Sequence, residues 1–272
     1  MTAAAGIAEP SGRGACVAVV KTQGSAPLLR CACRTDVGRV RARNEDAYRV
    51  APEQGWLVLA DGMGGYRGGD VAAAMAVDVV ISRLEAERAV LKDAAALAQV
   101  LRLAVAEANA EIHDVGLRRV EVAGMGSTIV IATFLPGSMV CAHVGDSRLY
   151  RFRDGALTLL TRDHTLLQEQ VDAGMIHPDE ARRSRFRGML TRGLGIERMV
   201  ELDVAEHETR QSDCYLLCSD GLTDMLMDDE IEAEIGVGGT LDEIAGRLVD
   251  VANMRGGRDN VTVILAQGAG SR

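Results

Sequence analysis

The chain has 272 residues, of which 47% are hydrophobic, so it is long enough to bury the core of one large domain. Its formal net charge of −9 opposes an extended grip on nucleic acid, which requires many uncompensated Lys and Arg side chains. No apolar run approaches the roughly 18 residues that span a bilayer, and the run at 15–20 is too short for the core of a signal peptide. We therefore expect a cytoplasmic protein without nucleic acid or membrane partners.

Residues 1–28 are rich in Ala, Gly, Ser and Pro and show little periodicity, which predicts a loosely ordered tail. The domain itself is expected to cover residues 29–268. Within it, Asp154 and Gly155 form a pair that is typical of a hairpin turn. Apolar alternation and short apolar runs predict strands at 29–34, 56–60, 127–134, 139–144, 149–152, 157–160, 200–204, 215–218 and 261–266.

Apolar residues recur at helical spacing in the segments 71–79, 97–112 and 241–251, and each segment predicts an amphipathic helix. The last of them is preceded by Thr240, with Glu243 at the spacing of a capping box. Two helices fall together between early strands, several strands then follow in succession, and a helix returns near the end. This order favours antiparallel sheets covered by helices over a doubly wound parallel sheet.

Acidic residues stand at the ends of predicted strands. Asp61, Asp146 and Asp220 come directly after strands, whereas Asp259 precedes the final strand. Rigidly held carboxylates are the ligands that hard divalent cations require, and neighbouring glycines let backbone carbonyls approach the ion. A single Asp-Gly pair is equally typical of a turn, but four carboxylates in similar positions favour a cation site.

The segment 38–46 adds two adjacent carboxylates, Glu45 and Asp46, and the nearby guanidinium of Arg41. Such groups are suited to ordering metal-bound water and to clamping a phosphate with two parallel hydrogen bonds. The same pattern is also typical of a solvated, charged loop.

Together these motifs resemble the metal-dependent protein phosphatases of type 2C, in the bacterial serine/threonine phosphatase branch. The resemblance spans roughly residues 31–267, and its blocks occur in the order of that family. They are RARNED at 41–46, DGMGG at 61–65, GMGST at 124–128, GDSR at 145–148, LTRGLG at 190–195, SDGL at 219–222 and DNVT at 259–262.

The resemblance implies an α+β fold, a four-layer α/β/β/α sandwich of two antiparallel sheets flanked by helices, with the metals in a cleft at one end of the sheets. It further implies two Mn²⁺ or Mg²⁺ ions. The residues that look like their ligands are Asp61, which would bridge the two ions, Asp220, Asp259 and Gly62 through its carbonyl oxygen. Asp146 resembles a ligand, shared with Asp220, of a weaker third metal.

Three further roles follow from the resemblance. Glu45 and Asp46 look like partners of metal-bound water, Asn260 supports the site, and Arg41 looks like the phosphate clamp. Two cations about 3.5–4 Å apart lower the pKa of a shared water, and the hydroxide attacks phosphorus in line with the departing seryl or threonyl oxygen. Because that attack is direct, we expect no phosphoenzyme intermediate.

The sequence departs from related phosphatases at a few positions. Met63 stands where many eukaryotic relatives carry a His, which leaves the proton donor to the leaving oxygen open. Tyr66 and Asp70 occupy positions where bacterial relatives often have His and Glu. We expect these changes to alter the rim of the cleft without abolishing activity.

Residues 164–195 are expected to form a mobile flap beside the cleft. Its arginines could bind an acidic or phosphorylated segment, although a solvated helical face is the alternative. His143 falls within an apolar strand and is expected to be a hydrogen-bonded core residue rather than a metal ligand. The flap arginines are Arg182, Arg183, Arg185 and Arg187.

Two other classes of protein compete with this interpretation. A serine hydrolase would use Ser147 or Ser219, but neither lies in a Gly-x-Ser-x-Gly elbow. A silent phosphopeptide-binding module would normally have lost a metal carboxylate, and all of them are present. We therefore predict a monomeric phosphoprotein phosphatase that acts on phosphoserine and phosphothreonine proteins and opposes a bacterial serine/threonine kinase in signal transduction.

Overall fold

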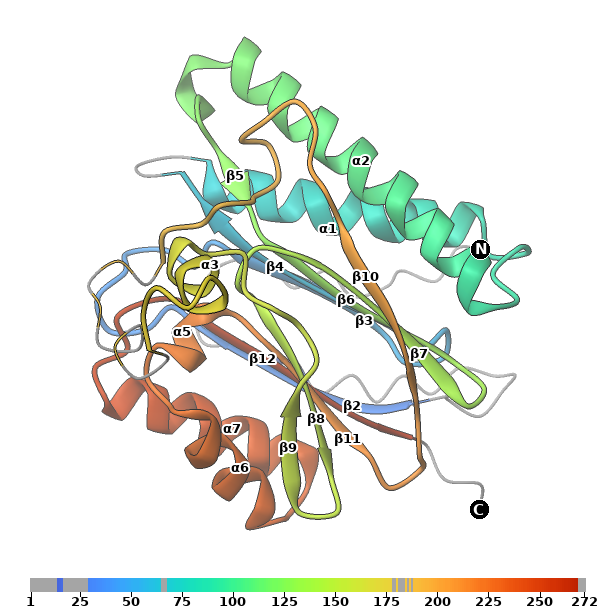
Figure 1. Cartoon of the computed structure of the whole chain (residues 1–272), viewed down its shortest axis with the longest axis vertical. Coiled ribbons are helices and arrows are strands. Elements are labelled where there is room, and N and C mark those ends of the chain that lie inside the picture. The colour runs from blue at the N-terminus through green and yellow to red at the C-terminus, as the bar shows by residue number, and fades with distance from the viewer. Residues whose placement is uncertain are drawn as a thin grey trace.

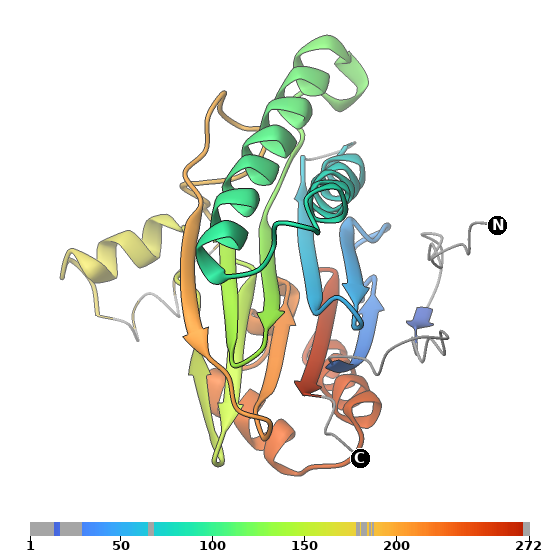
Figure 2. The same ribbon diagram turned by 90° about the vertical axis from the view of Figure 1, so that its right-hand side faces the viewer.

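Two antiparallel sheets lie face to face, and helices cover the outer face of each (Figure 1; Figure 2). The structure is a computed structural model that describes residues 14–16, 29–64, 68–177, 180, 184, 186 and 188–268. This arrangement confirms the expected four-layer α+β sandwich. None of the helices in these residues is both long and apolar enough to cross a membrane.

The first sheet contains strands from both ends of the chain. Its neighbouring strands are all antiparallel, and the chain's last strand lies in its interior. In spatial order they are β1 (Gly14–Cys16), β2 (Leu29–Asp36), β12 (Val261–Gly268), β11 (Cys214–Cys218), β8 (Arg148–Arg153) and β9 (Ala156–Leu159).

The second sheet is formed by the middle of the chain and is also antiparallel. A short strand, β5 (Gly126–Ser127), pairs with the end of β4. The main order is β10 (Asp203–Glu208), β7 (Ser138–Val144), β6 (Ile129–Leu135), β4 (Trp56–Met63) and β3 (Asp46–Ala51).

The long helices α1 and α2 pack on the second sheet, and α5, α6 and α7 pack on the first. A short helix, α3, lies in the segment expected to form the flap. Their bounds are α1 (Gly69–Ala86), α2 (Ala94–Arg118), α3 (Leu166–Asp172), α5 (Asp220–Thr223), α6 (Asp228–Gly236) and α7 (Leu241–Met254), with a 3-10 turn η1 (Val120–Val122) after α2.

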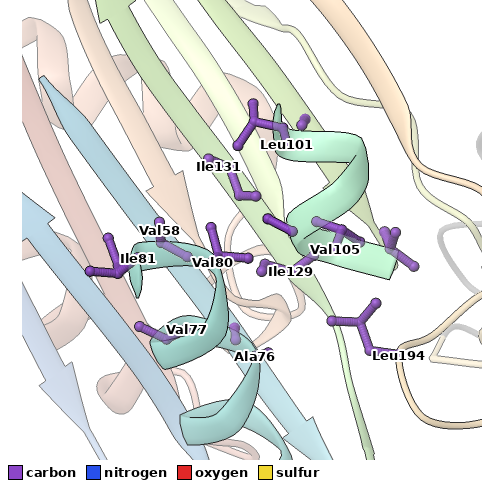
Figure 3. Packing of buried hydrophobic residues seen from close by; sticks show 14 of the residues in the cluster. Val58, Ala76, Val77, Val80, Ile81, Leu101, Val105, Ile129, Ile131 and Leu194 are labelled. Atoms are coloured by element: carbon purple, nitrogen blue, oxygen red, sulfur yellow. The ribbon is translucent and has the colours of Figure 1, made fainter. Parts of the chain in front are cut away.

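The buried hydrophobic side chains form three cores. Strand β4 is buried on both faces and separates two of them. Leu57 and Leu59 point into the layer between the sheets, whereas Val58 points toward α1 and α2. Figure 3 shows Val58 beside Val80 of α1 in this second core. Because β4 is held from both sides, the residues at its end have a rigid support.

Most predicted elements are confirmed, but several boundaries were wrong. Asp61 and Gly62 lie within β4 rather than after it, and the strand predicted at 200–204 is β10, which begins only at Asp203. The strand predicted at 127–134 is interrupted at Thr128. Strand β3 and helices α3, α5 and α6 were not predicted, because β3 is a half-buried edge strand and the helices are short.

The predicted tail contains β1, whose backbone pairs with β2. The remaining residues of 1–28 lie outside the described part of the chain. So do Tyr66 and the flap arginines at 182, 183, 185 and 187. The predictions made for these residues therefore stay predictions.

Candidate active site

Two acidic side chains face each other at one end of the second sheet. Asp46, the first residue of β3, lies opposite Asp61 of β4 in the antiparallel register. Like charges directly opposite each other destabilise a sheet. Burial, and then the charges of Asp46 and other carboxylates, raise the pKa of Asp61 well above its usual range. The pair is therefore arranged to receive positive charge.

Further carboxylates reach the same place from the first sheet. The end of β11 adjoins the beginning of β12, because the two strands are antiparallel. Asp220 follows β11 at the start of α5, and Asp259 precedes β12. Burial, and then the charges of Asp146 and Asp259, raise the pKa of Asp220 well above its usual range. The fold thus brings into one electrostatic cluster Asp46, Asp61, Asp146, Asp220 and Asp259.

The hydrogen bonds of Asp46 show which oxygen is available. Its Oδ2 accepts a hydrogen bond from Thr262 Oγ1 at 2.6 Å and another from Ser219 Oγ at 2.9 Å. Its Oδ1 is buried without a hydrogen-bond partner in the described part of the chain, as is Oδ1 of Asp220. A buried carboxylate oxygen without a partner is energetically costly. These oxygens fit a divalent cation or the water that such a cation holds.

Burial also raises the pKa of two other members of the cluster. The pKa of Asp46 rises to about 6, because burial outweighs the hydrogen bonds from Thr262 and Ser219. The pKa of Asp146 rises to about 7 through burial and the nearby charge of Asp163. A cation at the cluster would favour the charged form of both side chains.

Asn260 connects the loop before β3 to this cluster. Its Nδ2 donates hydrogen bonds to the carbonyl oxygens of Val37 at 3.0 Å and Arg43 at 2.7 Å. Its Oδ1 accepts a hydrogen bond from the backbone N–H of Glu45 at 2.8 Å. The carbonyl oxygen of Glu45 in turn accepts from Gly62 N at 3.2 Å. One side chain therefore holds the loop against β4.

Arg41 is bound to a carboxylate of the cluster. Its Nη2 lies 2.5 Å from Oδ2 of Asp259, while 52% of the arginine side chain remains exposed. The hydrogen bond to Asp259 is the largest cause of the raised pKa of Arg41. The guanidinium therefore supplies the positive charge that Asp259 faces, and its exposed side remains open to an anion.

Two glycines of the motifs allow close backbone approach. A Cβ atom at Gly62 would overlap the carbonyl oxygen of Gly69 at the start of α1. A Cβ atom at Gly221 would overlap the carbonyl oxygen of Asn260. These contacts let α1 approach β4 and α5 approach β12 closely.

Three positions were expected to alter the rim of the cleft. Met63 is the last residue of β4, and Tyr66 lies outside the described residues. Asp70 lies in the first turn of α1, where its charge adds to burial in raising the pKa of Glu45. Glu45 is thus another carboxylate whose charged form would be favoured by a nearby cation.

The two serines considered as nucleophiles are buried in hydrogen-bond networks. Ser219 Oγ donates to Asp46 and accepts from the backbone N–H of Thr262 at 3.0 Å. Ser147 Oγ lies 2.7 Å from Oγ1 of Thr128. Both serines are at most 1% exposed, so they act as supports of the carboxylate cluster rather than as nucleophiles.

A second group of side chains with metal-binding chemistry lies beside this cluster. His143, His164 and Asp203 offer ligand atoms within 4.8 Å of one another. However, the two imidazole rings are stacked at a centroid distance of 4.7 Å, so their in-plane lone pairs do not converge. Arg192 Nη1 lies 2.9 Å from Oδ1 of Asp203 and 3.4 Å from Nε2 of His164, where a metal would have to lie.

The histidine group is therefore a hydrogen-bonded network. His143 Nε2 lies 2.8 Å from the carbonyl oxygen of Arg162, which confirms that His143 is a hydrogen-bonded core residue. Arg192 and Asp203 were not singled out from the sequence. The LTRGLG block contains Arg192 and could have pointed to it. Its partner Asp203 could not be inferred from the sequence, because it is the pairing of β10 with β7 that places Asp203 opposite His143.

Comparisons with known proteins agree with the fold. Residues 38–254 match the family model described as Protein phosphatase 2C. The serine/threonine phosphatase stp of Listeria monocytogenes is 39% identical over 237 residues, which cover 86% of this chain and 94% of the relative. Because the family model covers most of the chain, the chain belongs to the protein phosphatase 2C family.

Solved structures extend the comparison. The serine/threonine phosphatase Stp1 from Staphylococcus aureus has a TM-score of 0.84 and 33% identity, covering 92% of this chain and 100% of that one. The catalytic domain of the phosphatase PstP in complex with two manganese ions has a TM-score of 0.77 and 37% identity, covering 89% and 99%. The resemblance drawn from the sequence motifs is thereby confirmed.

Proposed function

We propose that this chain hydrolyses phosphoserine and phosphothreonine esters on proteins with the help of two Mn²⁺ or Mg²⁺ ions. Their ligands would be the carboxylates of Asp61, Asp220 and Asp259 and the carbonyl oxygen of Gly62. Asp146 would share a weaker third ion with Asp220. The observation that carries this proposal is the cluster of largely buried carboxylates, whose like charges repel one another and which includes two buried oxygens without partners in the described part of the chain.

The chain's own residues would position the reactants. When bound, the two cations supply a water of lowered pKa and offset the negative charge of the phosphate. Asp46 Oδ1 is free to accept a hydrogen bond from that water, because Thr262 and Ser219 occupy only Oδ2. Glu45 stands beside it on the loop that Asn260 holds.

Arg41 would bind the non-bridging oxygens of the phosphate. Its guanidinium can donate two parallel hydrogen bonds to a phosphate, and its side chain is half exposed. Asp259 accepts only from Nη2 of the guanidinium, so other donors of Arg41 can face the substrate. Charge that develops on the transferred phosphoryl group would then be offset by a fixed cationic donor.

The cellular role follows the same chemistry. A phosphoprotein phosphatase of the bacterial type would act in the cytoplasm as a monomer and oppose a serine/threonine kinase. Its substrates would be phosphoserine and phosphothreonine proteins, since the net charge of −9 disfavours nucleic acid.

Phosphate release from a phosphothreonine peptide tests the proposed reaction. We expect turnover by the purified chain in manganese, loss of turnover in EDTA, and recovery when manganese is restored. Serine-directed acylating reagents should leave turnover intact, because Ser147 and Ser219 are buried. Binding of the peptide without phosphate release by the folded, manganese-loaded chain would contradict the proposal and favour a binding module.

A further inference from the structure

A groove with a volume of about 790 Å³ lies between the end of β4 and the segment that precedes β10. Its apolar lining includes Met63, Leu190, Ile196 and Met199. Ile196 is 52% exposed and Met199 is 83% exposed, so both side chains are open to a partner. We call this feature the 188–201 groove. Its volume lies in the range of sites that bind small molecules.

The groove lies close to the carboxylate cluster along β4. Met63 and Asp61 are two residues apart in β4, so their side chains project from the same face of the strand roughly 7 Å apart along it. Leu194 exchanges backbone hydrogen bonds with Ser127 of β5, and Ser127 Oγ donates to the carbonyl oxygen of Asp61 at 2.9 Å. Figure 1 shows the segment between α3 and β10 passing beside β5.

The wall of the groove is held in place by α2. Asn109 Oδ1 accepts a hydrogen bond from Gly195 N at 2.8 Å, and its Nδ2 donates to the carbonyl oxygen of Glu197 at 3.1 Å. A Cβ atom at Gly193 would overlap Cε of Met63, so the glycine lets the methionine side chain pack against this segment. Such preorganisation lowers the entropy cost of binding a partner.

The charges of the described lining residues disfavour acidic ligands. Arg192 is the one cation among its described lining residues, and Asp203 binds it at 2.9 Å while Glu201 lies 3.9 Å away. Glu197 and Glu201 line the same groove and are both exposed. An apolar side chain with neutral or basic neighbours therefore fits this surface better than an acidic one.

We propose that the 188–201 groove binds an apolar side chain of the substrate protein that lies one or two residues from the phosphorylated serine or threonine. An extended peptide advances about 3.5 Å per residue, so two of its residues span the roughly 7 Å between Asp61 and Met63. Flexible methionine side chains suit apolar residues of different shapes. This inference rests on the proposed phosphatase function and adds a preference for substrate sequence.

Kinetics with matched phosphothreonine peptides test the inference. Leucine is placed at one of the four positions that flank the phosphothreonine, and each peptide is matched by one with aspartate there. Burial of a leucine side chain predicts a preference of roughly tenfold to a hundredfold in kcat/KM at one position at least. p-Nitrophenyl phosphate, which has no flanking residues, is measured in parallel.

Ile196→Glu and Met199→Glu should each remove most of the leucine preference. Each should also lower kcat/KM for the leucine peptide relative to kcat/KM for p-nitrophenyl phosphate. Val237→Glu makes the same kind of change at an exposed site after α6 and should leave the leucine preference and this relative kcat/KM unchanged. Equal turnover of leucine and aspartate peptides by the wild type, or an unchanged preference in both groove variants, would overturn the inference. Lack of manganese-dependent turnover of every substrate would instead overturn the proposed function, and the inference with it.

Discussion

Asp220→Asn is expected to lower manganese-dependent phosphopeptide turnover by roughly 10³-fold. Metal ions contribute several kcal/mol to stabilising a phosphoryl transition state, and each 1.36 kcal/mol corresponds to a tenfold change in rate. The same variant should unfold at a higher temperature than the wild type in EDTA at pH 8. The reason is that the raised pKa of Asp220 makes its charged form costly in the folded state above the ordinary pKa of an aspartate.

Phosphate release and thermal unfolding in EDTA measure these two effects on one pair of proteins. Asp250→Asn is the matched control, because Asp250 is exposed on α7 and should change neither quantity. Turnover within tenfold of the wild type would contradict a ligand role for Asp220. A lower unfolding temperature in EDTA would show that its carboxylate has a stabilising partner.

Arg41→Ala is expected to lower kcat/KM for the phosphopeptide by roughly tenfold to a hundredfold without weakening manganese binding. A hydrogen bond to a charged group contributes about 1.5–3 kcal/mol, which sets this range. Manganese affinity should not fall, because removal of the guanidinium frees Asp259, to which Arg41 is bound. Arg41→Lys should be intermediate, since lysine keeps the charge but lacks the planar pair of donors.

Steady-state kinetics at several manganese concentrations separate these effects. Arg43→Ala is the control, because that side chain is exposed on the same loop and should alter kcat/KM by no more than about threefold. If saturating manganese restored full turnover to Arg41→Ala, the arginine would act through the metal site rather than on the phosphate.

Local patterns predicted the strands and long helices because their apolar periodicity is strong. Strand β4 alternates between two cores, and α7 carries the capping box between Thr240 and Glu243 that its sequence predicts. The edge strand β3 lacked such a signal, since all of its residues are half-buried. As a result, the opposition of Asp46 and Asp61 could not be foreseen from periodicity.

That the carboxylates converge could be predicted only from the order of the motifs along the chain. Asp61 and Asp220 belong to different sheets, and no local pattern brings residues from two sheets together. The hydroxyl groups that orient Asp46 illustrate what remained hidden. Ser219 and Thr262 lie within two of the motifs, yet serine and threonine beside aspartate are common in turns and gave no separate signal.

The 188–201 groove was also invisible in the sequence. Its wall depends on hydrogen bonds from Asn109, a residue on the buried face of α2 that periodicity assigns only to packing. Its charge balance depends on the pair between Arg192 and Asp203, which requires the observed start of β10.

Calorimetric titration of manganese into the metal-free chain tests most directly whether the carboxylate cluster is the metal centre. We expect two ions per chain, as in the solved relative that holds two manganese ions. Asp61→Asn should lose this binding, whereas His164→Ala should retain it, because Arg192 already binds Asp203 in the histidine group. Undiminished binding by Asp61→Asn, together with loss of binding by His164→Ala, would place the metal at the histidines and contradict the account.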